Sequence, residues 1–416
     1  MKTTLLCAAF ALLATGAVAQ QPTPPPPAPA PEVQGPPGRK DEPSHPAHPG
    51  GDKVLVEKGI FPKSISIPGT DASFSIGGYA KVDFIQDFDS IGDAYEFKTN
   101  TIPVAGTAAS DLSGRTTIHA RETRINLEFR AAKRFRAFVE GDFFGDKNAF
   151  RLRHAYGEFG RLLAGQTWST FQDISARPLT VDFEGPDAEI FVRQALLRFT
   201  QPLGKSAQWA LAVENPSPDV TVPSNETGVV QSNVPDFVTH LRFSGKRGHV
   251  QLGGLLRQLR FDGEGASADV SATGFGVHGS FNVKPFGKDE LMGQVAYGEG
   301  IAHYVEALSG QGSDAVFGSG GGLEALPVTS GVIGFTHHWS ATLRSGVSYA
   351  IADLDNDAAQ SGSALSRCQD FRVNLFYTPY RLVDVAVEAL WGRRDNKDGS
   401  HGEAWRGQLA VVYRFN

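Results

Sequence analysis

The chain has 416 residues, a formal net charge of −6, 47 glycines, two methionines and 10% aromatic residues. This length suits one large barrel or two ordinary domains, and the composition favours strands joined by many turns over packed helices. The mild charge gives no reason to expect a nucleic-acid partner.

Residues 1–19 have the features of a secretory signal peptide. Lys2 provides the positive end, an apolar run extends from Leu5 to Ala14, and Ala17-Val18-Ala19 forms a small-residue cleavage site. The run is too short to span a bilayer as a helix, and no later stretch of about 18 apolar residues follows. We therefore predict an exported protein that is cleaved after Ala19.

Residues 20–51 are rich in proline and include Pro24-Pro25-Pro26-Pro27. Proline fixes its own φ and lacks a backbone donor, so this stretch is predicted to be a disordered, polyproline-like tether in the periplasm. A contact with peptidoglycan or another partner is the alternative. Residues 52–71 are expected to bridge this tether to a single domain over residues 72–416.

From about Ala72 to the end, segments of some ten residues alternate between apolar and polar side chains. In the last segment, Trp405, Leu409 and Val411 share one parity, whereas Arg406 and Gln408 share the other. A period of two places the two sets on opposite faces of a strand. About sixteen such segments start near residues 72, 115, 134, 149, 161, 189, 207, 235, 248, 269, 288, 327, 340, 366, 382 and 403.

An even number of strands of this length predicts an all-β fold, namely a closed antiparallel transmembrane β-barrel. Tight and long connections alternate, as expected of short periplasmic turns and longer external loops. The alternative is a soluble β-sandwich, whose apolar face is a core. Here the polar face carries many arginines and the other face is aliphatic, with aromatic residues near strand ends, which favours lipid outside and water inside. We therefore predict a location in the outer membrane of a Gram-negative bacterium.

The C-terminus, Tyr413-Arg414-Phe415, resembles the signal that the barrel assembly machinery reads. That signal normally ends at the aromatic residue, whereas Asn416 follows here. The barrel assembly machinery is accordingly an expected partner through Tyr413 and Phe415.

Several stretches resemble the DcaP-like trimeric porins. Glu140–Gly145 is one of them, and the strongest is Leu152–Gly157 with Leu163–Phe171, continuing into Asp182–Pro186 and Phe191–Gln194. The resemblance implies a sixteen-stranded homotrimer that passes small anionic solutes, dicarboxylates among them. Members often carry a coiled-coil segment before the barrel, but this chain has the proline-rich stretch and no heptads, so the assembly role of a coiled coil is not carried over.

The parity of the strands predicts a lumen lined by arginines. A guanidinium stays charged and binds carboxylates bidentately, and on a lipid face near mid-bilayer it would cost roughly 2–4 kcal/mol. The alternative is that these arginines only pair with wall carboxylates, namely Glu122, Glu128, Glu140, Asp142, Glu214 and Glu388. The predicted lumen arginines are Arg124, Arg130, Arg136, Arg151, Arg153, Arg198, Arg242, Arg257, Arg344 and Arg372.

Residues 169–188 form a long link after the fifth predicted strand. We expect this link to fold inward as a constriction loop, with acids facing the lumen arginines; a role in trimer contact or surface cover is the alternative. Arg193 has the opposite parity to Arg198, so one of the two is expected outside the barrel. The charged residues of the link are Asp173, Arg177, Asp182, Glu184 and Asp187.

Carboxylates and histidines are scattered without nucleophile–base spacing, and no catalytic motif is recognisable. We therefore predict no enzymatic activity, no cofactor and no metal site. The predicted function is a passive diffusion channel that favours small anions such as dicarboxylates. The alternative is a structural or adhesive barrel with a plugged lumen and a cell-wall tether, and a soluble periplasmic binding protein is a more distant one.

Overall fold

The computed structural model describes residues 57–112, 114–132 and 134–415. The predicted signal peptide and proline-rich tether lie outside these residues. In the described ranges, every helix is a three-residue 3-10 turn, and none is long or apolar enough to cross a membrane.

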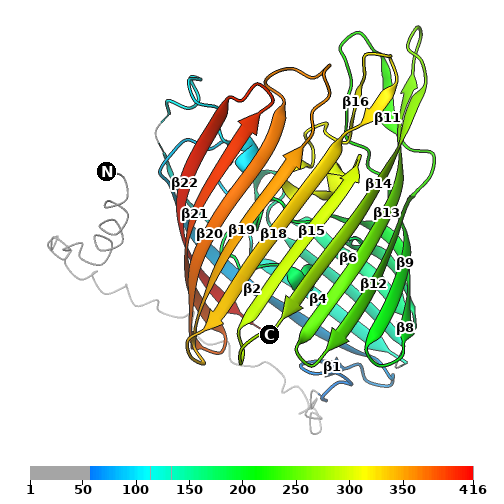
Figure 1. Cartoon of the computed structure of the whole chain (residues 1–416). Helices are drawn as coiled ribbons and strands as arrows, with labels where there is room; N and C mark the ends of the chain where they lie inside the picture. Colours follow the sequence, from blue (N-terminus) through cyan, green and yellow to red (C-terminus); the bar gives the residue numbers. More distant parts are fainter. Residues whose placement is uncertain (1–56, 113, 133, 416) are drawn as a thin grey trace, which may run out of the picture. The chain divides into compact units, whose positions relative to one another are not determined.

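The strands of the wall form one closed antiparallel sheet (Figure 1). Each strand pairs with its neighbour in the chain, and β22 returns to β2 in a register from Tyr79↔Arg414 to Asp87↔Arg406. The prediction of an all-β barrel of about sixteen strands is confirmed. In order, the wall consists of β2 (Ser73–Asp87), β3 (Thr116–His119) with β4 (Arg124–Ala131), β5 (Phe135–Asp142), β6 (Arg151–Phe159), β7 (Leu162–Trp168), β8 (Arg193–Leu203), β9 (Ala207–Glu214), β12 (Asp236–Gly245), β13 (Gly248–Gly263), β14 (Val270–Val283), β15 (Glu290–Glu299), β18 (Pro327–His338), β19 (Leu343–Leu354), β20 (Leu365–Tyr380), β21 (Val383–Asn396) and β22 (His401–Arg414).

The strand predicted from about residue 115 is interrupted in the structure. Both β3 and β4 pair with β2, and residues 120–123 between them leave the ladder through a turn in which Thr123 N donates to Ala120 O at 3.1 Å. Lys81 Nζ donates to the Glu122 carboxylate in this turn. The interruption thus places a wall carboxylate beside β2.

Five short strands lie outside the sequence prediction. They belong to connections rather than to the wall, so the alternating pattern of long strands does not reveal them. They are β1 (Ile65–Ser66), β10 (Val220–Thr221), β11 (Gly228–Gln231), β16 (Ala315–Phe317) and β17 (Leu323–Ala325).

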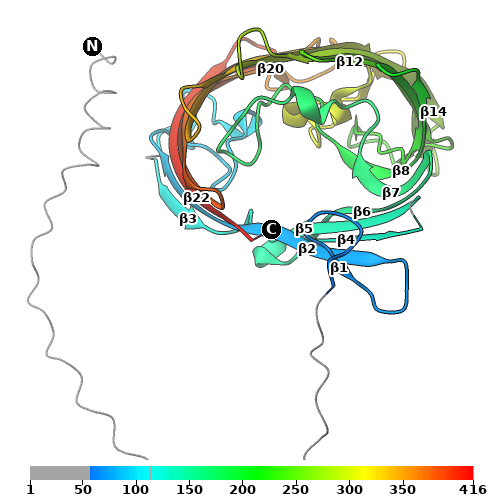
Figure 2. The ribbon, with the colours of Figure 1, turned by 90° about the horizontal axis from the view of Figure 1, so that it is seen from below.

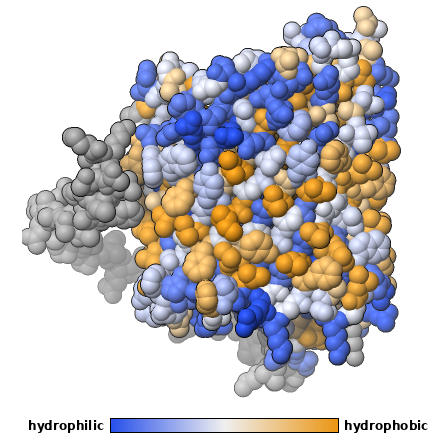
Figure 3. Space-filling view, in the orientation of Figure 1, coloured by the Kyte–Doolittle hydropathy of each residue, from blue (hydrophilic) through white to orange (hydrophobic). Residues whose placement is uncertain are grey.

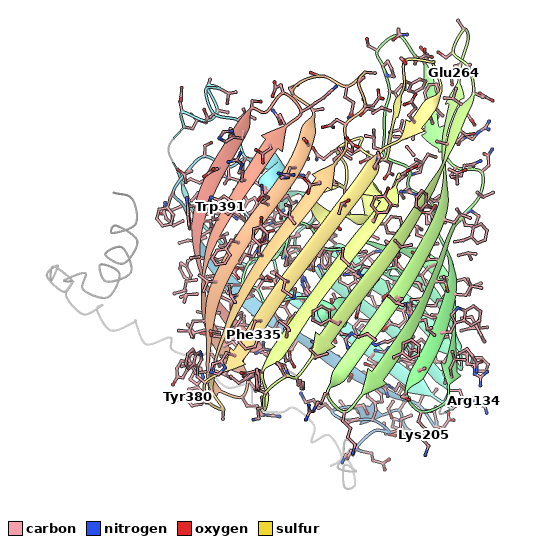
Figure 4. All side chains as sticks on the ribbon, in the orientation of Figure 1. Arg134, Lys205, Glu264, Phe335, Tyr380 and Trp391 are labelled. Carbon is pink, nitrogen blue, oxygen red and sulfur yellow. The ribbon has the colours of Figure 1, made fainter. Side chains whose placement is uncertain are left out.

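The outer face of the barrel is apolar. Leu252, Val277 and Val295 point outward with exposed fractions of 62%, 55% and 57%. Figure 3 shows hydrophobic residues across the middle of the visible face and hydrophilic residues along its upper and lower edges. Aromatic side chains lie near both ends of the wall, with Tyr380 at the lower end and Trp391 towards the upper end (Figure 4). An apolar band between aromatic ends is the surface expected of a lipid-facing barrel.

The wall is low on one side. Strands β4, β5, β6 and β7 have eight, eight, nine and seven residues, whereas β13 and β20 have sixteen each. A strand needs about 9–11 residues to cross a bilayer, so β6 is at the lower limit of that range and β4, β5 and β7 fall below it.

The segment before β2 lies at the lower end of the barrel, where Figure 1 shows β1. Ile65 pairs with Phe74, and Ile60 N donates to Ser73 Oγ at 3.0 Å. The Arg130 guanidinium lies 4.7 Å above the ring of Phe61, which is 8% exposed. These contacts attach the bridging segment to the same end of the barrel as the short turns.

Candidate functional site

Residues 169–192, between β7 and β8, fold into the barrel, as the view along the barrel shows (Figure 2). Residues 181–190 of this loop are all buried. We call residues 169–192 the constriction loop. Arg177 holds the loop together, because its Nε donates to Glu189 at 2.7 Å and its Nη2 to Glu184 O at 2.6 Å. Gly185 has a φ of 83° and lies against the Arg177 guanidinium, so a side chain would not fit there.

Asp173 fixes the first part of the constriction loop to the long wall. Its carboxylate accepts hydrogen bonds from Arg242 Nη1 at 2.9 Å on β12 and from Ser280 Oγ at 2.8 Å on β14. It also lies 2.7 Å from His249 Nε2 on β13 and accepts from Ser175 N at 3.1 Å. Burial acts to raise the pKa of Asp173, but Arg242 and these donors hold it below its usual value.

Asp182 and Asp187 fix the second part of the loop to the opposite wall. Arg372 Nη1 lies 3.4 Å from Asp182, and Arg372 Nη2 lies 3.6 Å from Asp187. Arg406 Nη1 lies 3.6 Å from Asp182, and Glu388 accepts from the Asp182 N–H at 2.8 Å. The loop acids therefore pair directly with wall arginines and anchor the loop.

A second loop, residues 300–326, also folds inward, and the sequence pattern did not reveal it. Phe191 N donates to Tyr304 O at 3.0 Å, and Glu306 N donates to Glu189 O at 3.1 Å, so the two loops are hydrogen-bonded to each other. Arg257 on β13 fixes this loop, because its Nη1 donates to Asp314 at 2.9 Å and to Gly300 O at 3.2 Å. The second loop carries the 3-10 turns η4 (Ala302–Tyr304) and η5 (Glu306–Leu308).

Three of the predicted lumen arginines thus anchor the inward loops, namely Arg242, Arg257 and Arg372. The side chains of Arg257 and Arg372 are fully buried, and that of Arg242 is 21% exposed. Of the predicted lumen arginines, these three lie on the inner face as parity indicated, but their guanidinium groups are paired with carboxylates there.

A β-bulge brings Arg153 to the lumen. Glu140 pairs with His154 and Gly141 pairs with Leu152, so Arg153 is the extra residue on β6. A bulge reverses the alternation of faces, so the inward set includes both Arg153 and its neighbour His154. Arg153 Nη1 donates to Asp142 at 2.8 Å and its Nε to Glu140 at 3.2 Å.

Arg124, Arg151 and Arg153 surround the tip of the constriction loop. Their guanidinium carbons lie 5.7, 5.6 and 5.2 Å from the ring of Phe183. Arg151 also forms a two-pronged pair with Asp142, at 3.0 and 2.9 Å. Phe183 stacks on Phe144 with ring centroids 4.2 Å apart.

Arg193 completes this basic group. Strand parity predicts that either Arg193 or Arg198 lies outside the barrel and does not include Arg193 among the lumen arginines. Its guanidinium carbon lies 4.5 Å from the ring of Trp168 and 5.7 Å from that of Phe191. Among the described residues it forms no ion pair, and its buried Nη1 has no hydrogen-bond partner. The charges that act most strongly on it are those of Arg153 and Glu306. Aromatic stacking thus holds this cation without occupying its N–H donors.

The remaining predicted arginines lie nearer the lower end. Arg136 Nε donates to Glu128 at 2.8 Å, and Arg130 pairs with the same carboxylate at 2.6 Å. Arg344 on β19 lies 3.5 Å from Asp384. Arg198 lies on the inner face of β8, where Glu214 is the carboxylate that acts most strongly on it. Pairing with wall carboxylates, the alternative raised from the sequence, therefore accounts for part of this set.

A cavity of about 750 Å³ lies beneath the constriction loop, between the low wall and strands β15, β18 and β19. Four arginines and two glutamates carry the permanent charge of its lining. They are Arg124, Arg153, Arg177, Arg344, Glu140 and Glu290.

Carboxylates gather on the side of the constriction formed by the two inward loops. Lys98 forms an ion pair with Glu96 and lies 3.9 Å from Glu184. Burial, followed by the neighbouring charge of Glu306, raises the pKa of Glu184. Burial raises the pKa of Glu189 to about 7 and that of Glu306 to about 7, the latter with help from Glu189. No group of three or more potential metal-ligating side chains that could hold an ion is found in the described part of the chain.

Comparisons with known proteins agree with this architecture. A family model described as DcaP outer membrane protein matches residues 60–416. The outer membrane channel DcaP of Acinetobacter baumannii is 22% identical, with a TM-score of 0.73 over 83% of this chain and 97% of that one. An anion-selective porin from Comamonas acidovorans is 11% identical, with a TM-score of 0.57 over 83% of this chain and 100% of that one. No curated protein matches the sequence.

Proposed function

Because the chain belongs to the DcaP outer membrane protein family, we propose that it is a passive diffusion channel that favours small anions, dicarboxylates among them. The cavity beneath the constriction loop carries the proposal, because four arginines and two glutamates line it. An aqueous path with excess fixed positive charge concentrates anions and repels cations.

The basic group around Phe183 supports the same proposal. Arg124, Arg151 and Arg153 approach one ring from the low wall, and Arg193 stands beside them without a carboxylate partner. A guanidinium with free donors can bind a passing carboxylate for a short time and release it, which is what conduction through a selective site requires.

Reversal potentials of the purified protein in planar bilayers test this proposal. In a KCl gradient, stepwise conductance with anion preference is expected. Cation preference would contradict the anion part, and the absence of any conductance would contradict a channel altogether. A liposome-swelling panel of dicarboxylates, amino acids and sugars then identifies the solute class.

The second candidate is a structural barrel with a plugged lumen. The burial of residues 181–190 and the hydrogen bonds between the two inward loops favour it. Conductance separates the two candidates, because a plugged barrel inserts into the bilayer without producing current steps.

We also propose that the barrel is a homotrimer whose low walls face one another. Strands β4–β7 are short, yet Leu127, Phe159 and Leu162 point outward with exposed fractions of 50%, 63% and 48%. Neighbouring copies would cover this apolar surface where the wall is low. Native mass spectrometry in detergent tests the trimer.

A further inference from the structure

We propose that Glu306, with Glu184 and Glu189 beside it, is the negative pole of the constriction and limits how strongly the channel prefers anions. The inference rests on the proposed function, since it concerns the selectivity of the same path. It assigns a specificity-determining role to Glu306, the carboxylate that acts most strongly on Arg193.

The position of Glu306 follows from the hydrogen bonds between the inward loops. Its backbone N–H donates to Glu189 O at 3.1 Å, and the next residue, Ala307, donates to Asp187 O at 2.8 Å. These bonds set η5 against the constriction loop. The Glu306 carboxylate is partly exposed and forms no hydrogen bond with the described residues.

The other acids of this group have cations of their own. Glu189 accepts from Arg177 at 2.7 Å, and Glu96 pairs with Lys98, which also lies 3.9 Å from Glu184 and 3.6 Å from Asp93. Glu306 has no ion pair among the described residues. Glu189 and Glu96 act on its charge from the neighbouring loops, and Lys98 and Arg193 oppose them.

Arg193 on β8 is the matching cation, because it too forms no ion pair in the described part of the chain. Glu306 is the carboxylate that acts most strongly on it, and Arg153, Arg151 and Arg124 are the other charges that it senses. In this proposal an anion that enters the constriction is influenced by one guanidinium and one carboxylate that form no ion pair with the described residues. The carboxylate opposes anions, so its removal increases anion preference.

Protonation removes the same charge. Burial and the neighbouring carboxylates raise the pKa of Glu306 to about 7 and that of Glu189 to about 7. These groups are mostly ionised at pH 8 and mostly neutral at pH 5, so anion preference rises as the pH falls between these values. His154 and His338 also line the cavity, so a variant is needed to assign the effect to Glu306.

The test measures reversal potentials of the full chain in planar bilayers at pH 8 and pH 5. At pH 8, Glu306→Gln is expected to raise the anion-to-cation permeability ratio several-fold, because two unit charges about 7 Å apart in water interact by about 0.6 kcal/mol and the substitution changes the anion and cation energies in opposite directions. The same variant is expected to change less than the wild type between the two pH values. Glu306→Asp keeps the charge and is expected to behave like the wild type.

Glu264→Gln is the matched control, because it removes one exposed carboxylate at the upper tip of the β13–β14 hairpin (Figure 4). Heat-modifiable migration on a gel checks assembly of each variant, and Glu306→Ser replaces Glu306→Gln if the latter does not assemble. Equal anion preference of Glu306→Gln and wild type at pH 8 would overturn the inference and leave the proposed function intact. A lack of anion preference in every variant at both pH values would instead overturn the proposed function, and the inference with it.

Discussion

Arg372 Nη1, on β20, lies 3.4 Å from Asp182 Oδ1 in the constriction loop, and both side chains are completely buried. Arg372 also binds Asp370 at 2.7 Å and lies 3.6 Å from Asp187. One guanidinium therefore compensates three carboxylates on two elements. This arrangement makes Arg372 the wall residue that pairs with both loop acids, Asp182 and Asp187.

Replacing Arg372 by Gln is expected to release the constriction loop. Among the described residues, Asp370 and Asp187 lose their ion pair and Asp182 keeps only Arg406, and breaking a buried ion pair from one side costs roughly 3–5 kcal/mol. Thermal unfolding monitored by gel migration is expected at a lower temperature, with larger and noisier single-channel currents. Arg367→Gln is the control on the same strand, because its pair with Asp353 is exposed and contributes only about 0–1 kcal/mol. Equal effects of the two substitutions would contradict the anchoring role.

Replacing Arg193 by Gln is expected to weaken anion preference. Arg193 forms no ion pair with any residue that the structure describes, so its charge is not compensated by a neighbouring carboxylate there. Two unit charges about 7 Å apart in water interact by about 0.6 kcal/mol, and loss of the cation changes the anion and cation energies in opposite directions, so the permeability ratio is expected to fall several-fold. Reversal potentials measure it. Arg247→Gln, at an exposed turn, removes the same charge elsewhere and is expected to leave the ratio unchanged.

Asp173 is expected to keep the first part of the loop anchored at mildly acidic pH. Burial alone would raise the pKa of Asp173, but Arg242 and its hydrogen-bond donors lower it below the unfolded value of about 3.9. Its contribution to stability is therefore complete above about pH 4 and is lost as the pH falls through the folded value. Mean conductance is expected to show no loop release between pH 7 and pH 5.

Asp173→Asn is expected to loosen the loop already at pH 7, because the buried charge-assisted hydrogen bonds contribute roughly 2–4 kcal/mol. Thermal unfolding and current noise measure the effect. Asp269→Asn is the control, since Asp269 pairs with Arg260 at an exposed position. Loop release in the wild type at pH 5 would show that Asp173 is not the anchor described.

Replacing Leu252 by Arg is expected to impair membrane insertion. Leu252 lies on the outer face of β13, and a cation near the midplane costs roughly 2–4 kcal/mol. Leu203→Arg makes the same change at the lower end of β8, next to Lys205, where the cost is about 0–1 kcal/mol (Figure 4). The folded fraction in liposomes is the measurement. Similar folded fractions for both variants would contradict the assignment of the lipid-facing band.

The sequence by itself determined the wall of this barrel. Alternation with a period of two is a local property, so segments such as the one containing Trp405 and Leu409 indicate strands and faces without knowledge of their partners. The predicted starts near residues 207, 248 and 327 coincide with β9, β13 and β18. Parity likewise placed Arg242, Arg257 and Arg372 on the inner face.

Only the tertiary structure decided what the inner arginines do. Arg372 meets Asp182 across 190 residues of sequence and Arg242 meets Asp173 across 69, so no local pattern distinguishes these loop anchors from the unpaired Arg193. The bulge at Arg153 also reverses a parity that a strict period of two carries forward. Selectivity depends on which charges remain uncompensated, and that is a property of distant contacts rather than of the strand in which each residue lies.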